Sequence, residues 1–146
     1  MSLLLSKVRS VEENLNDIQV SCSQLNIICL TGTHIDSLVP DTMLFDAADK
    51  PVFRVHSYFY VGGVLIACDY GLRCRQLDWG LQTFPVEVIA VEISGLKSRD
   101  LLVHCIYIPP SLVKDSPQPL SNVLEFVERY KATTLLMDDL NFPDIV

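Results

Sequence analysis

The stretch that decides the fold is residues 133–141, which read Thr-Thr-Leu-Leu-Met-Asp-Asp-Leu-Asn. The run from Thr133 to Met137 is short and largely apolar, which indicates a buried strand. Asp139 and Asn141 follow it, and two residues apart on an extended backbone they point the same way. Side chains at the carboxyl ends of strands are where the sites of α/β domains collect. On spacing alone, an Asx turn that merely ends the strand is the better interpretation.

The sequence before this stretch is mostly strand-like. We expect further strands over Asn26–Thr31, Val52–Tyr60, Val64–Asp69, Leu72–Leu77, Val86–Ile93 and Leu101–Tyr107. The glycines at 62 and 63 indicate a hairpin turn between the second and third of these. A capping-box pattern predicts a helix over roughly Ser10–Gln24, and a second helix follows Pro119, around Leu120–Val127. Residues 32–50 look irregular.

The order is therefore strand, helix, strand, a run of strands, helix and strand. It predicts an α/β domain with mixed strand pairing, because hairpins and crossovers both occur. A purely parallel, doubly wound sheet fits badly, since four consecutive strands lack intervening helices. We expect Asn26–Thr31, Leu101–Tyr107 and Thr133–Met137 to be central strands, because they are apolar on both faces. With no repeat or flexible linker, we expect residues 1–146 to belong to one domain.

Composition places the chain among ordinary globular proteins. It has 146 residues, of which 49% are hydrophobic and 20% charged. The apolar runs are too short to cross a bilayer, and Leu3-Leu4-Leu5 is shorter than the core of a signal peptide. The five cysteines form no CxxC pair, so we expect reduced core thiols and neither a disulfide framework nor a zinc site. These features predict an intracellular protein, nuclear or cytoplasmic, without a membrane span.

Charge and the other polar candidates leave the partner open. The net charge of −7 argues against tight binding of nucleic acid by a basic face, but not against a nuclease that holds a divalent cation. The sequence contains no glycine-rich phosphate loop, so we expect no small-molecule cofactor. Tyr107 ends an apolar strand and could donate to a phosphate oxygen, although such tyrosines are more often only half-buried. His34 is expected to be a loop residue, and His56 and His104 to be core or face residues.

Taken together, four stretches in order resemble the endonuclease/exonuclease/phosphatase superfamily. The closest resemblance is to the apurinic-type endonuclease domain of non-LTR, jockey-like retrotransposons, and it rests on residues 25–34, 62–67, 103–110 and 136–145. It implies a four-layered α/β sandwich, two mixed β-sheets flanked by helices, that cleaves phosphodiester bonds of DNA with Mg²⁺. It also implies that Asp139 orients the attacking water and contributes to the metal site, that Asn141 assists it, and that Tyr107 lies near the scissile phosphate.

The sequence departs from the family at three points. Gly32 stands where the family has a metal-holding glutamate, and glycine offers Mg²⁺ no ligand. Lys7 replaces an early asparagine in a looser alignment. The chain reaches Val146 before the Ser-Asp-His-type segment of the family, so we expect the N-terminal two thirds of such a domain. Three hypotheses follow: an inactive remnant of a mobile-element endonuclease, which we favour, a working DNA endonuclease, and a non-catalytic binding module that uses the same groove.

Overall fold

The computed structural model describes residues 1–8, 10–45, 50–55, 62–78, 86–94, 99–109, 118–130 and 133–139, without the side chains of residues 12, 118–120, 123, 138 and 139. The elements, in chain order, are β1 (Leu3–Lys7), α1 (Val11–Cys22), β2 (Ile27–Thr31), α2 (Asp41–Leu44), β3 (Val52–Val55), β4 (Val64–Cys68), β5 (Arg73–Leu77), β6 (Glu87–Ser94), β7 (Leu101–Tyr107), α4 (Gln118–Arg129) and β8 (Thr133–Asp139). The expected run of strands between two helices is confirmed. Residues 56–60 of the predicted strand Val52–Tyr60, which include His56, lie outside the described residues.

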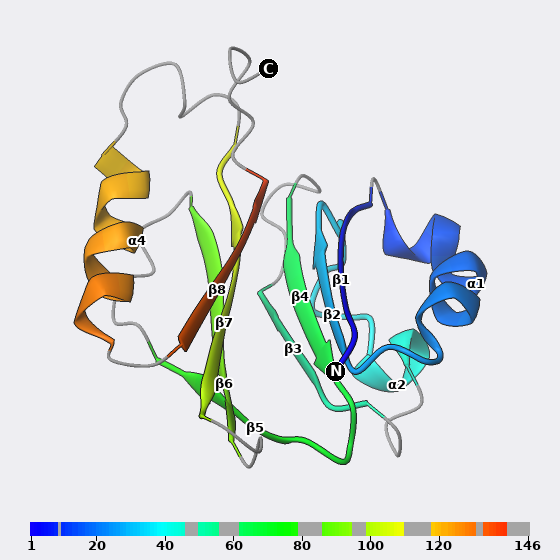
Figure 1. Ribbon diagram of the computed structural model, residues 1–146. Coiled ribbons are helices and arrows are strands. Elements are labelled where there is room, and N and C mark those ends of the chain that lie inside the picture. The colour runs from blue at the N-terminus through cyan, green and yellow to red at the C-terminus, as the bar shows by residue number, and fades with distance from the viewer. Residues whose placement is uncertain are drawn as a thin grey trace.

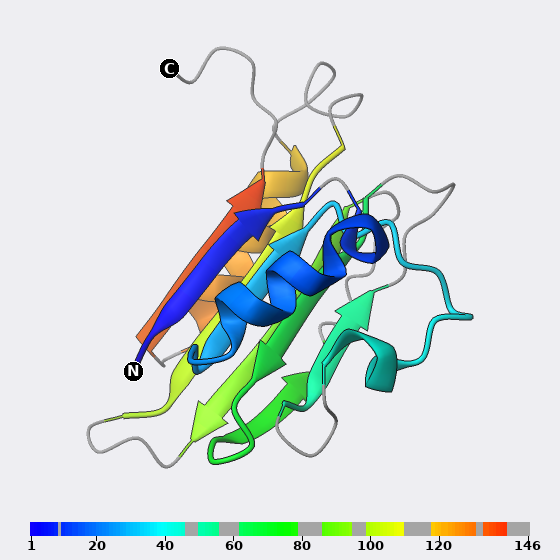
Figure 2. The ribbon, with the colours of Figure 1, turned by 90° about the vertical axis from the view of Figure 1, so that its right-hand side faces the viewer.

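The strands form two sheets that pack face to face (Figure 1). The first sheet has the order β1-β2-β4-β3, in which β1 is parallel to β2 and the other pairs are antiparallel. The second has the order β5-β6-β7-β8, in which β7 and β8 are parallel. Helices α1 and α2 cover the outer face of the first sheet, and α4 covers that of the second (Figures 1 and 2). Mixed pairing and the four-layered arrangement are thereby confirmed.

The hydrophobic core has one layer between the sheets and one under each set of helices. Ile27, Cys29 and Ile66 are among the buried residues of the inner layer, whereas Ile28 and Leu65 belong to the layer under α1 and α2. This alternation follows from strand geometry, in which neighbouring side chains leave opposite faces. Because both faces of these strands are covered, they read as continuous apolar runs.

Helix α1 begins where the capping pattern predicts. The Ser10 hydroxyl accepts a hydrogen bond from the backbone N–H of Glu13 at 3.5 Å. Val11, Ile18 and Cys22 are buried against the first sheet at helical spacing. No helix in the described part of the chain is long and apolar enough to cross a membrane.

One strand was expected without bounds, and one helix was not foreseen. The predicted order opens with a strand, but the bounds of β1 were not evident, because Leu3-Leu4-Leu5 shows no alternation and its pairing partner in β2 lies 24 residues away. Residues 32–50 were expected to be irregular, but α2 forms one turn there with Leu44 buried. So short a helix carries no periodic signal in the sequence.

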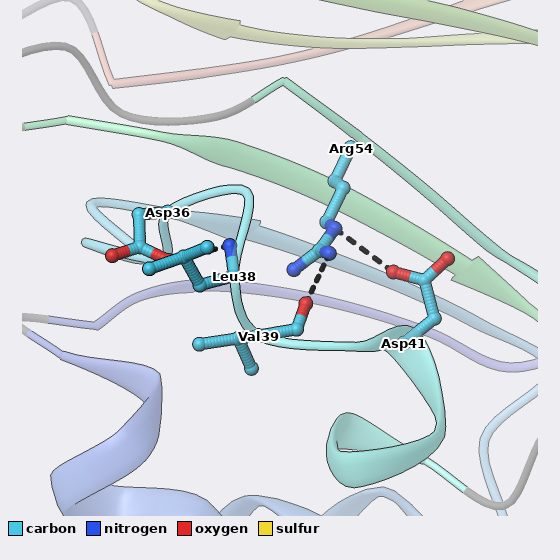
Figure 3. Close-up of polar contacts among 5 residues, drawn as sticks. All are labelled: Asp36, Leu38, Val39, Asp41 and Arg54. Atoms are coloured by element: carbon cyan, nitrogen blue, oxygen red, sulfur yellow. Dashed lines mark hydrogen bonds and ion pairs between the residues drawn. The ribbon is translucent and has the colours of Figure 1, made fainter.

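Helix α2 is tied to the first sheet by a polar contact from β3 (Figure 3). Arg54 Nε lies 2.8 Å from Asp41 Oδ1, and Arg54 Nη2 donates to the carbonyl oxygen of Val39. Nearby, Asp36 Oδ1 accepts from the N–H of Leu38 at 2.7 Å. These contacts fix the part of the chain around Val39 and Asp41 against the edge strand β3.

The expectation that Thr133–Met137 is a central strand is wrong. β8 lies at the edge of the second sheet, and Thr133 is exposed. Leu135 packs toward the inner layer while Leu136 packs beside Val127 of α4. A strand covered on both faces is apolar on both, whether or not it has two neighbours. The other two strands expected to be central, β2 and β7, are confirmed as such.

His104 is fully buried on the outer face of β7, as expected of a core residue. Its ring meets that of Phe126 edge-on, with the centroids 6.3 Å apart. Burial lowers the pKa of His104 from its ordinary value to about 4, because the charged form loses its hydration. The folded protein therefore holds this histidine neutral where an unfolded chain would bind a proton.

This difference makes stability depend on pH. The pKa of His104 is lower in the folded state than in the unfolded chain. Its contribution to the free energy of unfolding is therefore complete when the pH is above the pKa of the unfolded chain, and it is lost as the pH falls toward the pKa of the folded protein. Between pH 7 and pH 4 the free energy of unfolding should drop by up to about 3 kcal/mol from this group. Urea titrations over this range should show a shallower pH slope for His104→Leu. Equal slopes for the two proteins would contradict the assignment.

Candidate functional site

The carboxyl ends of β1, β2, β7 and β8 and the amino ends of β4 and β6 lie at one end of the molecule, the upper end in Figure 1. We call this end the rim. In the first sheet, Lys7, Thr31 and Val64 are register partners there. In the second, the strand directions bring Glu87 opposite Tyr107 and Tyr107 opposite Asp139.

Two of the candidate residues are thus neighbours at the rim. Tyr107 ends β7, and its side chain belongs to the inner core layer with 6% of its surface exposed. Asp139 ends β8, with its Cα opposite that of Tyr107. The side chain of Asp139 and all of Asn141 lie outside the described residues. The backbone therefore brings Tyr107 and Asp139 together, and their roles remain predictions.

Glu87 is a rim residue that the sequence analysis did not single out. Its Oε2 accepts a hydrogen bond from the backbone N–H of Gly63 at 2.5 Å, which joins the second sheet to the first. One signal was present in the sequence: an acidic residue opens β6, whose next four residues are all apolar. Alternation places it on the same face as Ile89 and Val91, which belong to the inner layer.

Gly62 and Gly63 make the close approach of the two sheets possible. A Cβ at Gly62 would lie 2.9 and 3.0 Å from the carboxyl oxygens of Glu87 and 3.0 Å from Cε1 of Tyr107. The φ angles are +93° at Gly62 and +90° at Gly63, which L side chains rarely adopt. Their carbonyls in turn accept from the segment after β2: Gly62 from His34 N at 2.9 Å, and Gly63 from Thr33 N at 3.3 Å.

Gly32 lies at the start of that segment, in a left-handed conformation with φ +66°. A Cβ there would be 2.5 Å from the backbone oxygen of Val8. Val8 is held in place because its N–H donates to Thr31 O at 2.9 Å. The backbone at position 32 therefore has no room for any side chain unless the segment after β1 moves. His34, confirmed as a loop residue, also has a positive φ of 54°.

The described part of the rim does not fit a resident Mg²⁺ ion. Mg²⁺ is usually held by one or two carboxylates with strict octahedral geometry. Gly32 supplies no side chain, and one oxygen of Glu87 already accepts from Gly63. Among the described residues, no three His, Cys, Asp or Glu side chains lie close enough together to hold a metal ion.

Replacing Gly62 with alanine tests the packing of the rim. The new methyl would press on Glu87 and Tyr107 and would strain the backbone, so we expect a loss of about 2–3 kcal/mol in unfolding free energy. Gly71→Ala is the matched control, because a Cβ there meets nothing within 4 Å. That control should stay within about 0.5 kcal/mol of the wild type. Equal effects of the two substitutions in thermal or urea unfolding would show that the rim is not closely packed.

Solved structures share this fold. The 3'-5' exonuclease NExo of Neisseria meningitidis superimposes with a TM-score of 0.75 at 20% identity, over 97% of this chain and 58% of that one. An AP endonuclease from Archaeoglobus fulgidus gives 0.74 at 18% identity, again over 97% and 58%. The endonuclease domain of TRAS1, a telomere-specific non-LTR retrotransposon, gives 0.67 at 16% identity, over 95% and 58%.

The comparisons confirm the resemblance to the endonuclease/exonuclease/phosphatase superfamily at the level of the fold. This chain spans about three fifths of the length of these structures. No family model and no curated protein sequence matches it. NExo has also been solved with a product DNA hairpin, and the TDP2 protein of D. rerio with a single-strand DNA product.

Proposed function

We propose that this chain, whose fold is that of the endonuclease/exonuclease/phosphatase superfamily, is a retrotransposon-derived phosphodiesterase domain that no longer hydrolyses DNA. In the proposed ancestral site, Asp139 oriented the attacking water with the help of Asn141, and Tyr107 donated to the scissile phosphate. The neighbouring Cα positions of Tyr107 and Asp139 support this assignment. A bound Mg²⁺ ion would have stabilised charge on the phosphate oxygens.

The observation that carries the proposed inactivity is the backbone at Gly32. The family resemblance requires a glutamate here, and the chain has a left-handed glycine against Val8 O. The carboxyl group is absent at this position, and the backbone conformation of Gly32 also leaves no space for a side chain that could carry one. Losing a single transition-state contact commonly costs about a hundred- to a thousandfold in rate. A ligand of the metal that polarises the phosphate is such a contact.

DNA is the proposed substrate of the ancestral enzyme and the ligand against which binding should be tested. The net charge of −7 disfavours strong residual binding, because DNA affinity depends largely on contacts from lysine and arginine to phosphates. We place the protein inside the cell, nuclear or cytoplasmic, because its five cysteines are free thiols and structural disulfides are rare there.

We expect the purified 146-residue chain not to nick abasic or plain duplex DNA with Mg²⁺ above the level of an Asp139→Ala control. Supercoiled plasmid relaxation and a labelled abasic duplex are suitable assays. Asp138→Ala serves as the matched control, since it removes the adjacent carboxyl group. Mg²⁺-dependent nicking that is abolished by Asp139→Ala and retained in Asp138→Ala would establish a working endonuclease instead.

Restoring the glutamate should not restore activity. In Gly32→Glu the Cβ would meet Val8 O at 2.5 Å, so the side chain can enter only if the β1–α1 connection shifts. We expect this variant to remain inactive and to unfold at lower denaturant concentration than the wild type. A stable Gly32→Glu protein that nicks DNA with Mg²⁺ would show that the rim still accepts the family's metal site.

A further inference from the structure

We propose that Cys68 and Cys74 form a thiol-modification site, in which Cys74 attacks a low-molecular-weight disulfide and Cys68 then closes an intramolecular disulfide between the two sheets. The site lies at the opposite end of the molecule from the rim. It is independent of the proposed function.

The path of the chain brings the two thiols together. Cys68 is the last residue of β4 in the first sheet, and Cys74 is the second residue of β5 in the second sheet. Residues 69–72 cross from one sheet to the other at the lower end in Figure 1. Cys68 is a fully buried member of the inner layer, and Cys74 is partly buried and packs against the same layer.

The crossing segment holds this arrangement in place. It contains a tight turn, in which the N–H of Leu72 donates to Asp69 O at 2.9 Å. Its first residue is tied to the first sheet, because the N–H of Asp69 donates to Asn26 O at 2.7 Å. The backbone of Cys68 is fixed as well, through a 3.0 Å bond to Pro51 O. The two thiols therefore meet because of the fold and not through free movement of a loop.

Exposure distinguishes Cys74 from the other thiols of the chain. Cys22, Cys29, Cys68 and Cys105 are all buried, whereas Cys74 is half-buried. The Cys105 thiol donates to Leu30 O at 3.7 Å within the core. A dissolved reagent can thus reach Cys74 before any other cysteine of the folded protein.

Exposure assigns the roles of the two thiols, because Cys74 is half-buried and Cys68 is buried. Their interaction lowers the pKa of Cys74 and, together with burial, raises the pKa of Cys68. Cys74 is therefore the more accessible and the more acidic thiol, and the thiolate is the nucleophilic form of cysteine. An accessible nucleophile with a buried partner beside it is the arrangement of an attacking and a resolving thiol.

The chemistry balances with oxidised glutathione as the oxidant. The Cys74 thiolate attacks one sulfur of the glutathione disulfide, the S–S bond breaks, and one glutathione thiolate leaves. Cys68 then loses its proton to solvent and attacks Sγ of Cys74, which expels the second glutathione. The two cysteines are oxidised to one disulfide, and one glutathione disulfide is reduced to two thiols.

The test is oxidation of the native 146-residue chain with oxidised glutathione, followed by alkylation of free thiols, chymotryptic digestion and mass spectrometry. Tyr70 and Leu72 lie between the two cysteines, so cleavage there yields two peptides joined only by the expected bond. In the wild type these peptides should be found linked. In Cys68→Ala, Cys74 should instead accumulate as the glutathione adduct, and Cys74→Ser should take up no glutathione under native conditions.

Reactivity of the untreated protein provides a second readout that does not depend on how the variants fold. Near neutral pH, iodoacetamide should modify Cys74 at least about tenfold faster than Cys29, because reaction requires an accessible thiolate. A wild-type protein that stops at the Cys74–glutathione adduct would overturn the role of Cys68. Equal alkylation of Cys74 and Cys29 in the folded chain would overturn the site altogether.

Discussion

The hydrogen bond from the N–H of Gly63 to the carboxyl group of Glu87 connects the two sheets at the rim. Among the described residues, most other contacts between the sheets are made by apolar side chains, whose attraction is strong but not directional. A hydrogen bond requires defined distances and angles, so it fixes which part of one sheet faces which part of the other. The positions of Tyr107 and of the segment after β2 relative to each other depend on this contact.

Around that contact, the glycines of the rim let backbone segments approach neighbouring residues closely. A Cβ atom at Gly62 would lie closer to Glu87 and Tyr107 than van der Waals contact allows. The same glycines accept hydrogen bonds from Thr33 and His34, and Gly32 lies directly before these. The glycine at position 32 is thus part of a consistent local structure. A carboxyl group at that point would need a different path for the segment after β1, which is why a single substitution is a poor route back to a metal site.

The elements that could be predicted from the sequence are those with a regular local pattern of apolar residues or a capping motif. Alternation and apolar runs located β2, β4, β6 and β7, and Ser10 marked the start of α1. The family resemblance assigned Asp139 and Tyr107 to one site, and their Cα atoms are register partners because parallel strands end at the same edge. An opening strand was expected, but the bounds of β1 were not, since a parallel pair made with a distant segment leaves no local pattern. β8 was expected at the centre of its sheet because its side chains are apolar on both faces. An apolar sequence shows that both faces of a strand are covered, but it does not show whether the strand has a neighbour on each side.

The role of Glu87 could not be predicted for a related reason. Its partner Gly63 lies 24 residues away, just before a strand of the other sheet, so an acidic residue at the start of β6 did not show what it would contact. The two glycines were recognised as a turn, but a turn motif does not show what packs against it. The thiol pair was hidden in the same way, because Cys68 and Cys74 looked like two separate residues until the crossing between the sheets was known.

Amide hydrogen exchange at Gly63 tests the central claim, that the bond to Glu87 holds the two sheets together at the rim. In the wild type the Gly63 amide should be protected well beyond that of an open turn, and Glu87→Ala should speed its exchange by about ten- to a hundredfold. The amide of Cys68, bonded to Pro51 O at the far end of β4, provides the internal control and should be unchanged. Exchange of the wild-type Gly63 amide at the rate of an unprotected turn, or the same rate in Glu87→Ala, would contradict the account.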